Sequence, residues 1–241
     1  IVHLFTIMKL YIVVFLFYYV TSFSQNTNSL DDLYPNEDVL IEYHDEWGEK
    51  NFQKLIDEFK KNPLKKGDIV FLGNSITQGG NNWNQRLNHS NIKNRGIGGD
   101  VTDGVLARLD EIIFFKPKAV FLLIGINDLW NVSPNIPALE YIGNNIIQIA
   151  KLIKQNSSET KVYVQTILPV EKKIFKEPIK SVNSMIKRNQ DTNVFEIIDL
   201  YSVFVNEQGL IKNDLSTDGV HLNEAGYQVW VNYIKPIFDT L

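Results

Sequence analysis

Three side chains of this sequence could together break an ester bond, and each lies next to a predicted turn. Ser75 follows an unbroken apolar run, Ile69–Leu72, of the kind that forms a strand buried on both faces. A residue just beyond the carboxyl end of such a strand stands where open parallel sheets place their ligands. A serine hydroxyl is a weak nucleophile without a base. His221 can supply that base, with Asp218 close by to fix the tautomer of its ring, so the sequence indicates acyl transfer.

The same chemistry needs hydrogen-bond donors for the negative oxygen of a tetrahedral intermediate. We expect them from the backbone N–H groups of Ser75 and Gly99 and from the side-chain amide of Asn127, which follows the apolar run Ala119–Ile124. A glycine at position 99 would let a substrate approach the backbone closely. Taken singly, these residues have ordinary explanations, since Asp218 could cap a helix and Asn127 could end a strand. Their occurrence together, at the carboxyl ends of predicted strands or in the following loops, favours catalysis.

The spacing of apolar residues predicts the elements that must position these side chains. Strands are expected at 69–72, 92–95, 119–124, 162–167 and 194–198, and helices at 43–61, 101–115, 136–153, 174–188 and 224–238. Strands that alternate with helices form a parallel sheet covered by helices on both faces. The sequence therefore predicts an α/β fold, one domain in three layers.

Composition and motifs exclude several other functions. The chain has 241 residues, 44% hydrophobic and 22% charged, and a formal net charge of -4, so nothing points to nucleic acid as a partner. It contains no cysteine, which excludes disulfides and thiolate metal sites. Two glycine-rich turns invite a nucleotide interpretation. However, Gly73–Gly79 lacks the Gly-Lys-Ser/Thr ending of a phosphate loop, and Val101 occupies the third glycine position of the dinucleotide fingerprint.

The N-terminal segment, residues 1–24, has the pattern of a secretory signal peptide. Met8 and Lys9 precede an apolar run over 10–20, and the small residues Ser22 and Ser24 stand before the expected cut. We expect cleavage to leave Gln25 at the N-terminus of a secreted or periplasmic protein with no stable membrane insertion. The alternative is an uncleaved anchor, since residues 1–20 nearly reach the roughly 20 apolar residues of a membrane span. Beyond the signal we divide the chain into an N-terminal leader and packing helix, 25–66, and a hydrolase domain, 67–241.

Four short segments carry a resemblance to a known family. They read Gly73-Asn74-Ser75-Ile76-Thr77, Gly96-Ile97-Gly98-Gly99-Asp100, Gly125-Ile126-Asn127-Asp128 and Asp218-Gly219-Val220-His221. This ordered set resembles the four blocks of the SGNH (GDSL) hydrolase family. The second block and the helix after it look most like platelet-activating-factor acetylhydrolase-type members and related bacterial acetylesterases. The resemblance extends from about Asp68 to the C-terminus.

The resemblance implies a fold, a set of residue roles and an activity. It implies a flavodoxin-like fold with a five-stranded parallel sheet in the order 2-1-3-4-5, and an esterase that needs no metal or organic cofactor. The four residues that give the SGNH family its name would be Ser75, Gly99, Asn127 and His221. The third member of the catalytic triad would be Asp218. One departure is Asn74, where the family usually has aspartate; asparagine keeps the acceptor oxygen that ties down the loop but carries no charge. The chain also lacks the Gly-x-Ser-x-Gly pattern of the α/β-hydrolase elbow.

The substrate is less well defined, because fold and triad do not choose one. We expect a small-molecule or glycan acyl ester, with acetyl groups on carbohydrate first, since aromatic and amide side chains near the predicted catalytic loops suit sugar rings. These side chains are Trp83, Trp130, Asn81, Asn82 and Asn131. The alternatives are a lysophospholipase or thioesterase with a long apolar channel, and a non-catalytic binding domain. On the predicted helix 43–61, Tyr43 and Trp47 could pack on the sheet or contact a ligand. The oligomeric state stays open.

Overall fold

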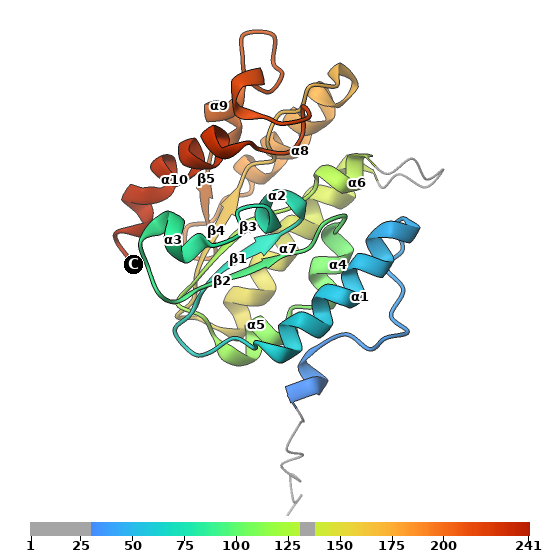
Figure 1. Ribbon diagram of the computed structural model, residues 1–241, viewed down its shortest axis with the longest axis vertical. Helices are drawn as coiled ribbons and strands as arrows, with labels where there is room; N and C mark the ends of the chain where they lie inside the picture. Colours follow the sequence, from blue (N-terminus) through green and yellow to red (C-terminus); the bar gives the residue numbers. More distant parts are fainter. Residues whose placement is uncertain (1–29, 131–137) are drawn as a thin grey trace, which may run out of the picture.

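The computed structural model of the chain describes residues 30–130 and 138–241 (Figure 1). The predicted signal peptide, residues 1–24, and Asn131 lie outside these ranges. Within the described ranges, no helix is both long enough and apolar enough to cross a membrane.

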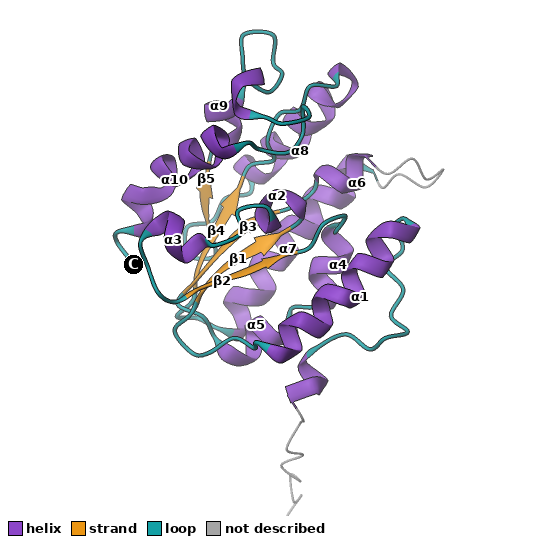
Figure 2. Ribbon diagram, in the orientation of Figure 1, coloured by secondary structure: helices purple, strands orange, loops and turns teal. Residues whose placement is uncertain are grey.

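Five parallel strands form one sheet, and their order confirms the predicted 2-1-3-4-5 (Figure 2). The strands are β1 Ile69–Gly73, β2 Ile92–Gly96, β3 Ala119–Leu123, β4 Lys161–Gln165 and β5 Glu196–Ile198. β1 pairs with both β2 and β3, so the chain reverses its direction of winding at β1. Such a reversal opens a crevice at the carboxyl ends of the strands, where ligands bind in open α/β sheets. Ser75, the first residue of α2 Ser75–Gln78, lies just beyond this point.

Helices cover both faces of the sheet. The long ones are α1 Glu46–Lys61, α7 Leu139–Asn156, α8 Lys176–Arg188 and α10 Glu224–Phe238; the short ones are α2 Ser75–Gln78, α3 Trp83–Leu87, α4 Thr102–Ala107, α5 Asp110–Phe115, α6 Ile126–Trp130 and α9 Leu200–Phe204. Figure 1 shows α7 and α10 on opposite sides of the strands. The short helices α2 and α6 directly follow β1 and β3, so both begin at the carboxyl edge of the sheet.

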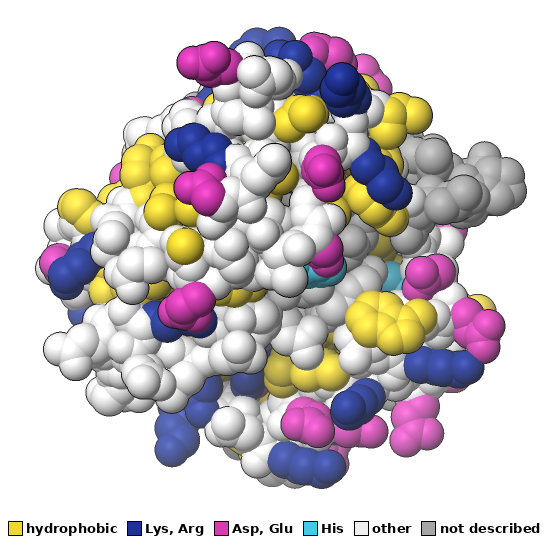
Figure 3. Space-filling view, turned by 45° about the horizontal axis from the view of Figure 1, so that its top comes forward, with side chains coloured by type: hydrophobic (Ala, Val, Ile, Leu, Met, Phe, Trp, Pro, Cys, Tyr) yellow, Lys and Arg dark blue, Asp and Glu magenta, His cyan; other side chains and the backbone are white. Residues whose placement is uncertain are grey.

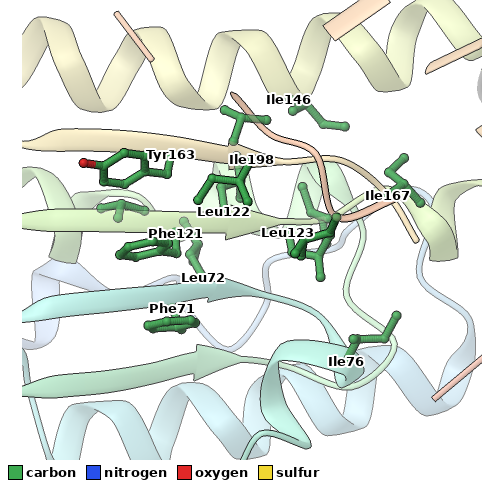
Figure 4. Packing of buried hydrophobic residues seen from close by; sticks show 14 of the residues in the cluster. Phe71, Leu72, Ile76, Phe121, Leu122, Leu123, Ile146, Tyr163, Ile167 and Ile198 are labelled. Atoms are coloured by element: carbon green, nitrogen blue, oxygen red, sulfur yellow. The ribbon is translucent and has the colours of Figure 1, made fainter. Parts of the chain in front are cut away.

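Aromatic rings form a ladder across one face of the sheet and fix its packing against α3 and α10. Phe71, Phe121 and Tyr163 stand opposite one another in register on β1, β3 and β4, and their rings stack at centroid distances of 4.9 and 4.8 Å (Figure 4). Trp83 stacks on Phe71 at 4.1 Å and meets Trp230 edge-on. Removing such a buried ring typically costs about 3–5 kcal/mol of unfolding free energy.

The structure corrects one predicted helix. The sequence predicts a single helix over 101–115, but the chain forms α4 and α5 with a break between them. At the break, Arg108 has a φ of -120° and turns its guanidinium toward the carbonyl oxygen of Gly73 and the carboxylate of Asp100. A buried guanidinium needs such partners, and reaching them interrupts the helical spacing that the apolar residues would otherwise continue.

Candidate active site

The nucleophile loop is fixed by contacts on each side of Ser75. Asn74 caps α2, because its Oδ1 accepts a hydrogen bond from the backbone N–H of Ile76 at 3.1 Å. This is the loop contact that we expected asparagine to retain in place of aspartate. Tyr227 of α10 donates its hydroxyl hydrogen to the carbonyl oxygen of Ile76 at 2.8 Å. Ser75 is thus the first residue of a short, doubly anchored helix.

The structure brings Ser75, His221 and Asp218 into a chain of short hydrogen bonds. Ser75 Oγ lies 2.9 Å from His221 Nε2, and His221 Nδ1 lies 2.7 Å from Asp218 Oδ2. The second carboxylate oxygen of Asp218 accepts the backbone N–H groups of Val220 at 3.0 Å and His221 at 2.8 Å. Asp218–His221 is therefore the tight turn that the spacing requires. Partial burial opposes ionisation of Asp218, but these hydrogen bonds outweigh it and lower its pKa to about 2.

Gly99 and Asn127 are linked through Asp100, the residue after Gly99. Asn127 is in the first turn of α6, and its Nδ2 donates to the carbonyl oxygen of Asp100 at 2.9 Å. An amide nitrogen carries two hydrogens, so this bond orients the side chain and leaves the second hydrogen for a ligand. Gly99 has a φ of +81°, the left-handed region that favours glycine. The backbone N–H of Gly98 donates to Gln78 Oε1 at 2.7 Å, which joins this loop to α2.

A pocket of about 260 Å³ opens beside His221 and Asn127. Ile126, Trp130 and Val220 supply its apolar lining, and Lys172 lies at its wall with Nζ 3.9 Å from the centre of the Trp130 ring. Figure 3 shows this face of the molecule, where histidine surface (cyan) lies in a hollow bordered by hydrophobic side chains (yellow). The arrangement combines a hydroxyl, a base with an ionised partner, fixed N–H donors and a small pocket, which are the parts that acyl transfer requires.

Comparison with known proteins agrees with this chemistry. The sequence profile described as the GDSL-like Lipase/Acylhydrolase family matches residues 71–229. The chain belongs to this family. It is therefore a carboxylic ester hydrolase, as the four sequence blocks predict.

Individual members of the GDSL-like family show how far the similarity extends. The chain is 26% identical over 211 residues to platelet-activating factor acetylhydrolase IB subunit alpha2 of Homo sapiens, covering 83% of this chain and 86% of that protein. The structure of a GDSL-like lipase from Bacteroides thetaiotaomicron matches with a TM-score of 0.66 and 25% identity, over 79% of this chain and 98% of the lipase. An acetyl xylan esterase shares the fold, with a TM-score of 0.59 and 21% identity over 70% of this chain and 98% of that chain.

A buried ion pair between Asp100 and Arg108 supports the Gly99 loop of this GDSL-like chain. The sequence did not predict it. Asp100 is fully buried, and Arg108 donates to its Oδ2 from Nε at 3.0 Å and from Nη2 at 2.7 Å. The same Nη2 donates to the carbonyl oxygen of Gly73 at 3.0 Å, and His44 Nε2 lies 3.1 Å from Asp100 Oδ1. This pair thus ties the end of β1 to the loop that carries Gly99. An arginine inside an apolar helical stretch was the available sequence signal.

A second buried carboxylate, Asp128, lies behind Asn127. It accepts the backbone N–H of Thr102 and the Thr102 hydroxyl, the latter at 2.6 Å. Asn145 of α7 in turn donates to Thr102 Oγ1 at 3.0 Å. Complete burial raises the pKa of Asp128 to about 6, although the hydrogen bonds from Thr102 oppose the rise. The sequence placed Asp128 in the third of the four family-like blocks, with a strand-ending turn as the alternative, and predicted no buried contact with Thr102.

The structure separates the residues that were expected to contact a sugar. Trp130 lines the pocket beside His221. Trp83 is wrong as a ligand residue, because only 1% of it is exposed and its Nε1 donates to the carbonyl oxygen of Thr77. Asn81 and Asn82 border a separate depression formed with Arg86 and Glu224.

Proposed function

We propose that this chain is a secreted serine esterase that removes short acyl groups, acetyl foremost, from carbohydrate or related esters. The observation that carries the proposal is the chain of hydrogen bonds from Ser75 through His221 to Asp218, placed beside a pocket of about 260 Å³. The platelet-activating factor acetylhydrolase subunits, which carry acetyl hydrolysis in their name, support the acyl preference. The pattern of residues 1–24 supports export.

In the first half of the proposed reaction, Ser75 Oγ bonds to the carbonyl carbon while its proton passes to His221 Nε2, 2.9 Å away. The carbonyl oxygen becomes an oxyanion, which the backbone N–H groups of Ser75 and Gly99 and the Asn127 amide stabilise. Each such donor is typically worth about 3–4 kcal/mol in the transition state. When the intermediate collapses, the alcohol leaves with the proton from His221, and the acyl group stays on Ser75.

In the second half, a water molecule loses a proton to His221 and attacks the acyl-enzyme. The carboxylic acid is released, and Ser75 Oγ recovers its proton from His221. Asp218 holds the imidazole in the tautomer whose Nε2 accepts the serine proton, and it balances the charge of the imidazolium. With its pKa lowered to about 2, Asp218 stays ionised through this cycle at ordinary pH.

The size of the pocket favours short acyl groups. Pockets that enclose a drug-sized ligand usually measure roughly 300–1,000 Å³, and this one falls below that range at about 260 Å³. Its lining also includes Lys172 and Glu171, whose charged ends are poor neighbours for a long alkyl chain. Short acyl groups therefore fit the pocket better than the long chains of lysophospholipids.

The direct test is the Ser75→Ala variant, measured on acetyl and long-chain acyl esters side by side. We expect loss of hydrolysis by roughly 10⁵–10⁶-fold, as for removal of other triad nucleophiles, with an unchanged melting temperature. In the wild type, an organophosphonate should label Ser75. Residual activity of more than a small fraction, or a label on another residue, would refute the assignment. Preference for long chains would instead favour a lysophospholipase or thioesterase.

A further inference from the structure

A tryptophan from the N-terminal segment lies against the Gly99 loop. Trp47 is in the first turn of α1, outside the matched residues 71–229, and 61% of its surface is exposed. A Cβ atom added to Gly98 or to Gly99 would lie only 2.9 Å from its ring. The indole is therefore in close contact with the backbone that offers Gly99 N–H. The sequence left open whether Trp47 packs on the sheet or contacts a ligand, and its exposure rules out a place in the core.

Several contacts hold this first turn in place. Asn51, one turn further along α1, donates from Nδ2 to the carbonyl oxygen of Gly98 at 2.8 Å. Asp45 caps the helix through the backbone N–H of Gly48. His44 just before the cap is buried and contacts Asp100. The ring is thus a fixed exposed surface, and a preorganised surface loses little conformational entropy when a ligand covers it.

The position of Trp47 relative to the chemistry suggests which part of a substrate it meets. In the proposed reaction the carbonyl oxygen lies at Gly99 N–H, and the acyl group enters the pocket beside Asn127 and Val220. The alcohol oxygen must stay within reach of His221 Nε2, which protonates it. A sugar ring attached to that oxygen cannot share the small pocket with the acyl group, so it extends over the open surface at the Gly99 loop where the indole lies. Amides flank the ring there, since Gln78 and Asn51 both lie against Gly98. An apolar ring face bordered by amides suits the C–H face and the hydroxyls of a pyranose.

We propose that Trp47 is a specificity-determining residue, a platform on which the sugar ring of an acetylated carbohydrate stacks while its ester is cleaved. This inference rests on the proposed function and extends it to the alcohol side of the substrate. It also gives the N-terminal segment a role, since α1 then forms one wall of the active site. Figure 1 shows the N-terminal end of α1 at the same edge of the sheet as α2 and α6.

The test compares two acetyl esters, glucose pentaacetate and ethyl acetate, whose alcohol is too small to cover an indole. In Trp47→Ala the ratio of kcat/KM for the sugar ester to that for ethyl acetate should fall about tenfold, the factor expected when roughly 55 Å² of apolar contact is lost. The loss should lie mainly in KM, and Trp47→Phe should recover most of it. Phe114→Ala is the matched control, because this aromatic residue is 56% exposed on α5; it should leave the ratio and the activity unchanged.

Each other outcome overturns the inference. An unchanged ratio in Trp47→Ala means that the sugar does not touch the ring. An equal loss on both esters, with no recovery in Trp47→Phe, means that Trp47 only supports the loop. A wild-type enzyme that cleaves ethyl acetate but not the sugar ester refutes the carbohydrate part of the proposed function, and the inference with it. The last result is recognised in the wild type alone, so the two failures are distinguishable.

Discussion

The two sides of the active site are built in different ways. On one side, Asp218 and His221 come from a single turn, and their side chains are 52% and 46% exposed. Their mutual orientation depends on hydrogen bonds that span at most three residues of sequence. On the other side, the loop that carries Gly99 is held by Asp100 and Arg108, which are buried and join segments far apart in the chain. The first side is thus held by contacts within one solvent-exposed turn. The second is held by buried contacts between segments that are far apart in the chain.

The carboxylates of the two sides show what this difference means in physical terms. Asp218 remains partly solvated and accepts three hydrogen bonds from its own turn, which lower its pKa to about 2 despite partial burial. Asp128 accepts hydrogen bonds from Thr102 as well, but complete burial raises its pKa to about 6. The exposed side therefore holds a charge at little structural cost. The buried side carries charges whose loss or mispairing affects folding.

The largest difference between the effect on catalysis and the effect on stability is expected for Asp218→Asn, on the exposed side. Asparagine can offer the imidazole a donor where it needs an acceptor, which favours the wrong tautomer, and we expect kcat to fall by roughly 10⁴-fold. The midpoint of urea unfolding should fall much less than in variants of the buried side, because solvent screens the charge of a side chain that is 52% exposed. Steady-state kinetics and equilibrium unfolding of the same preparation check both statements. Activity near wild type would remove Asp218 from the mechanism and leave Ser75 and His221 as a dyad.

The opposite result is expected on the buried side for Arg108→Met. The substitution leaves the Asp100 carboxylate buried without its main partner, which typically costs about 3–5 kcal/mol of unfolding free energy. Adding Asp100→Asn should restore part of the loss, since it removes the uncompensated charge. Denaturant unfolding of the single and double variants measures the effect.

A matched control for Arg108→Met is Lys187→Met. Lys187 pairs with Asp199 at the same nitrogen–oxygen distance, 2.7 Å, but both side chains are substantially exposed. Losing such a surface pair should cost below about 1 kcal/mol. If both variants lose the same unfolding free energy, burial is not what distinguishes the two sides of the site.

Asn127→Ala tests the buried side through catalysis. It removes one proposed oxyanion donor, and kcat should fall by roughly 10²–10³-fold while KM changes little. Covalent labelling of Ser75 by an organophosphonate should remain possible, since the nucleophile and its base are intact. Rapid-quench or steady-state assays with a short acyl ester give the two constants. A rise in KM with unchanged kcat would place Asn127 in ground-state binding instead.

The difference between the two sides also explains what could be read from the sequence. The strands themselves, α10 and the positions of Ser75 and His221 follow from apolar runs and the turns after them, because these patterns are local, whereas the strand order came from the family resemblance. Arg108 contacts Gly73, 35 residues earlier, and His44 contacts Asp100, 56 residues later. No local pattern marks such pairs. The spacing of apolar residues likewise could not separate buried Trp83 from exposed Trp47, because it records which residues are apolar and not what covers them.

The burial of Asp128 should make the free energy of unfolding depend on pH. Its folded pKa, about 6, lies above the value near 3.9 of an unfolded aspartate. Below about pH 4 Asp128 is protonated in both the folded and the unfolded state, so its ionisation contributes nothing to the free energy of unfolding. Between about pH 4 and 6 the unfolded chain releases the proton while the folded chain keeps it, so rising pH favours unfolding. Above pH 6 the penalty is constant, at about 3 kcal/mol for two pKa units.

Asp128→Asn should remove this penalty, because the amide oxygen can still accept from Thr102 and carries no charge to desolvate. Relative to the wild type, the variant should therefore gain about 3 kcal/mol of unfolding free energy between pH 4 and pH 7. Urea unfolding at one-unit pH steps measures the difference. Asp110→Asn controls for the loss of one carboxylate, because Asp110 is exposed at the start of α5, and its curve should follow the wild type. A pH-independent difference between Asp128→Asn and the wild type would mean that Asp128 is ionised in the folded protein throughout, with Thr102 outweighing burial. The buried side of the site would then hold its charge as readily as the exposed one.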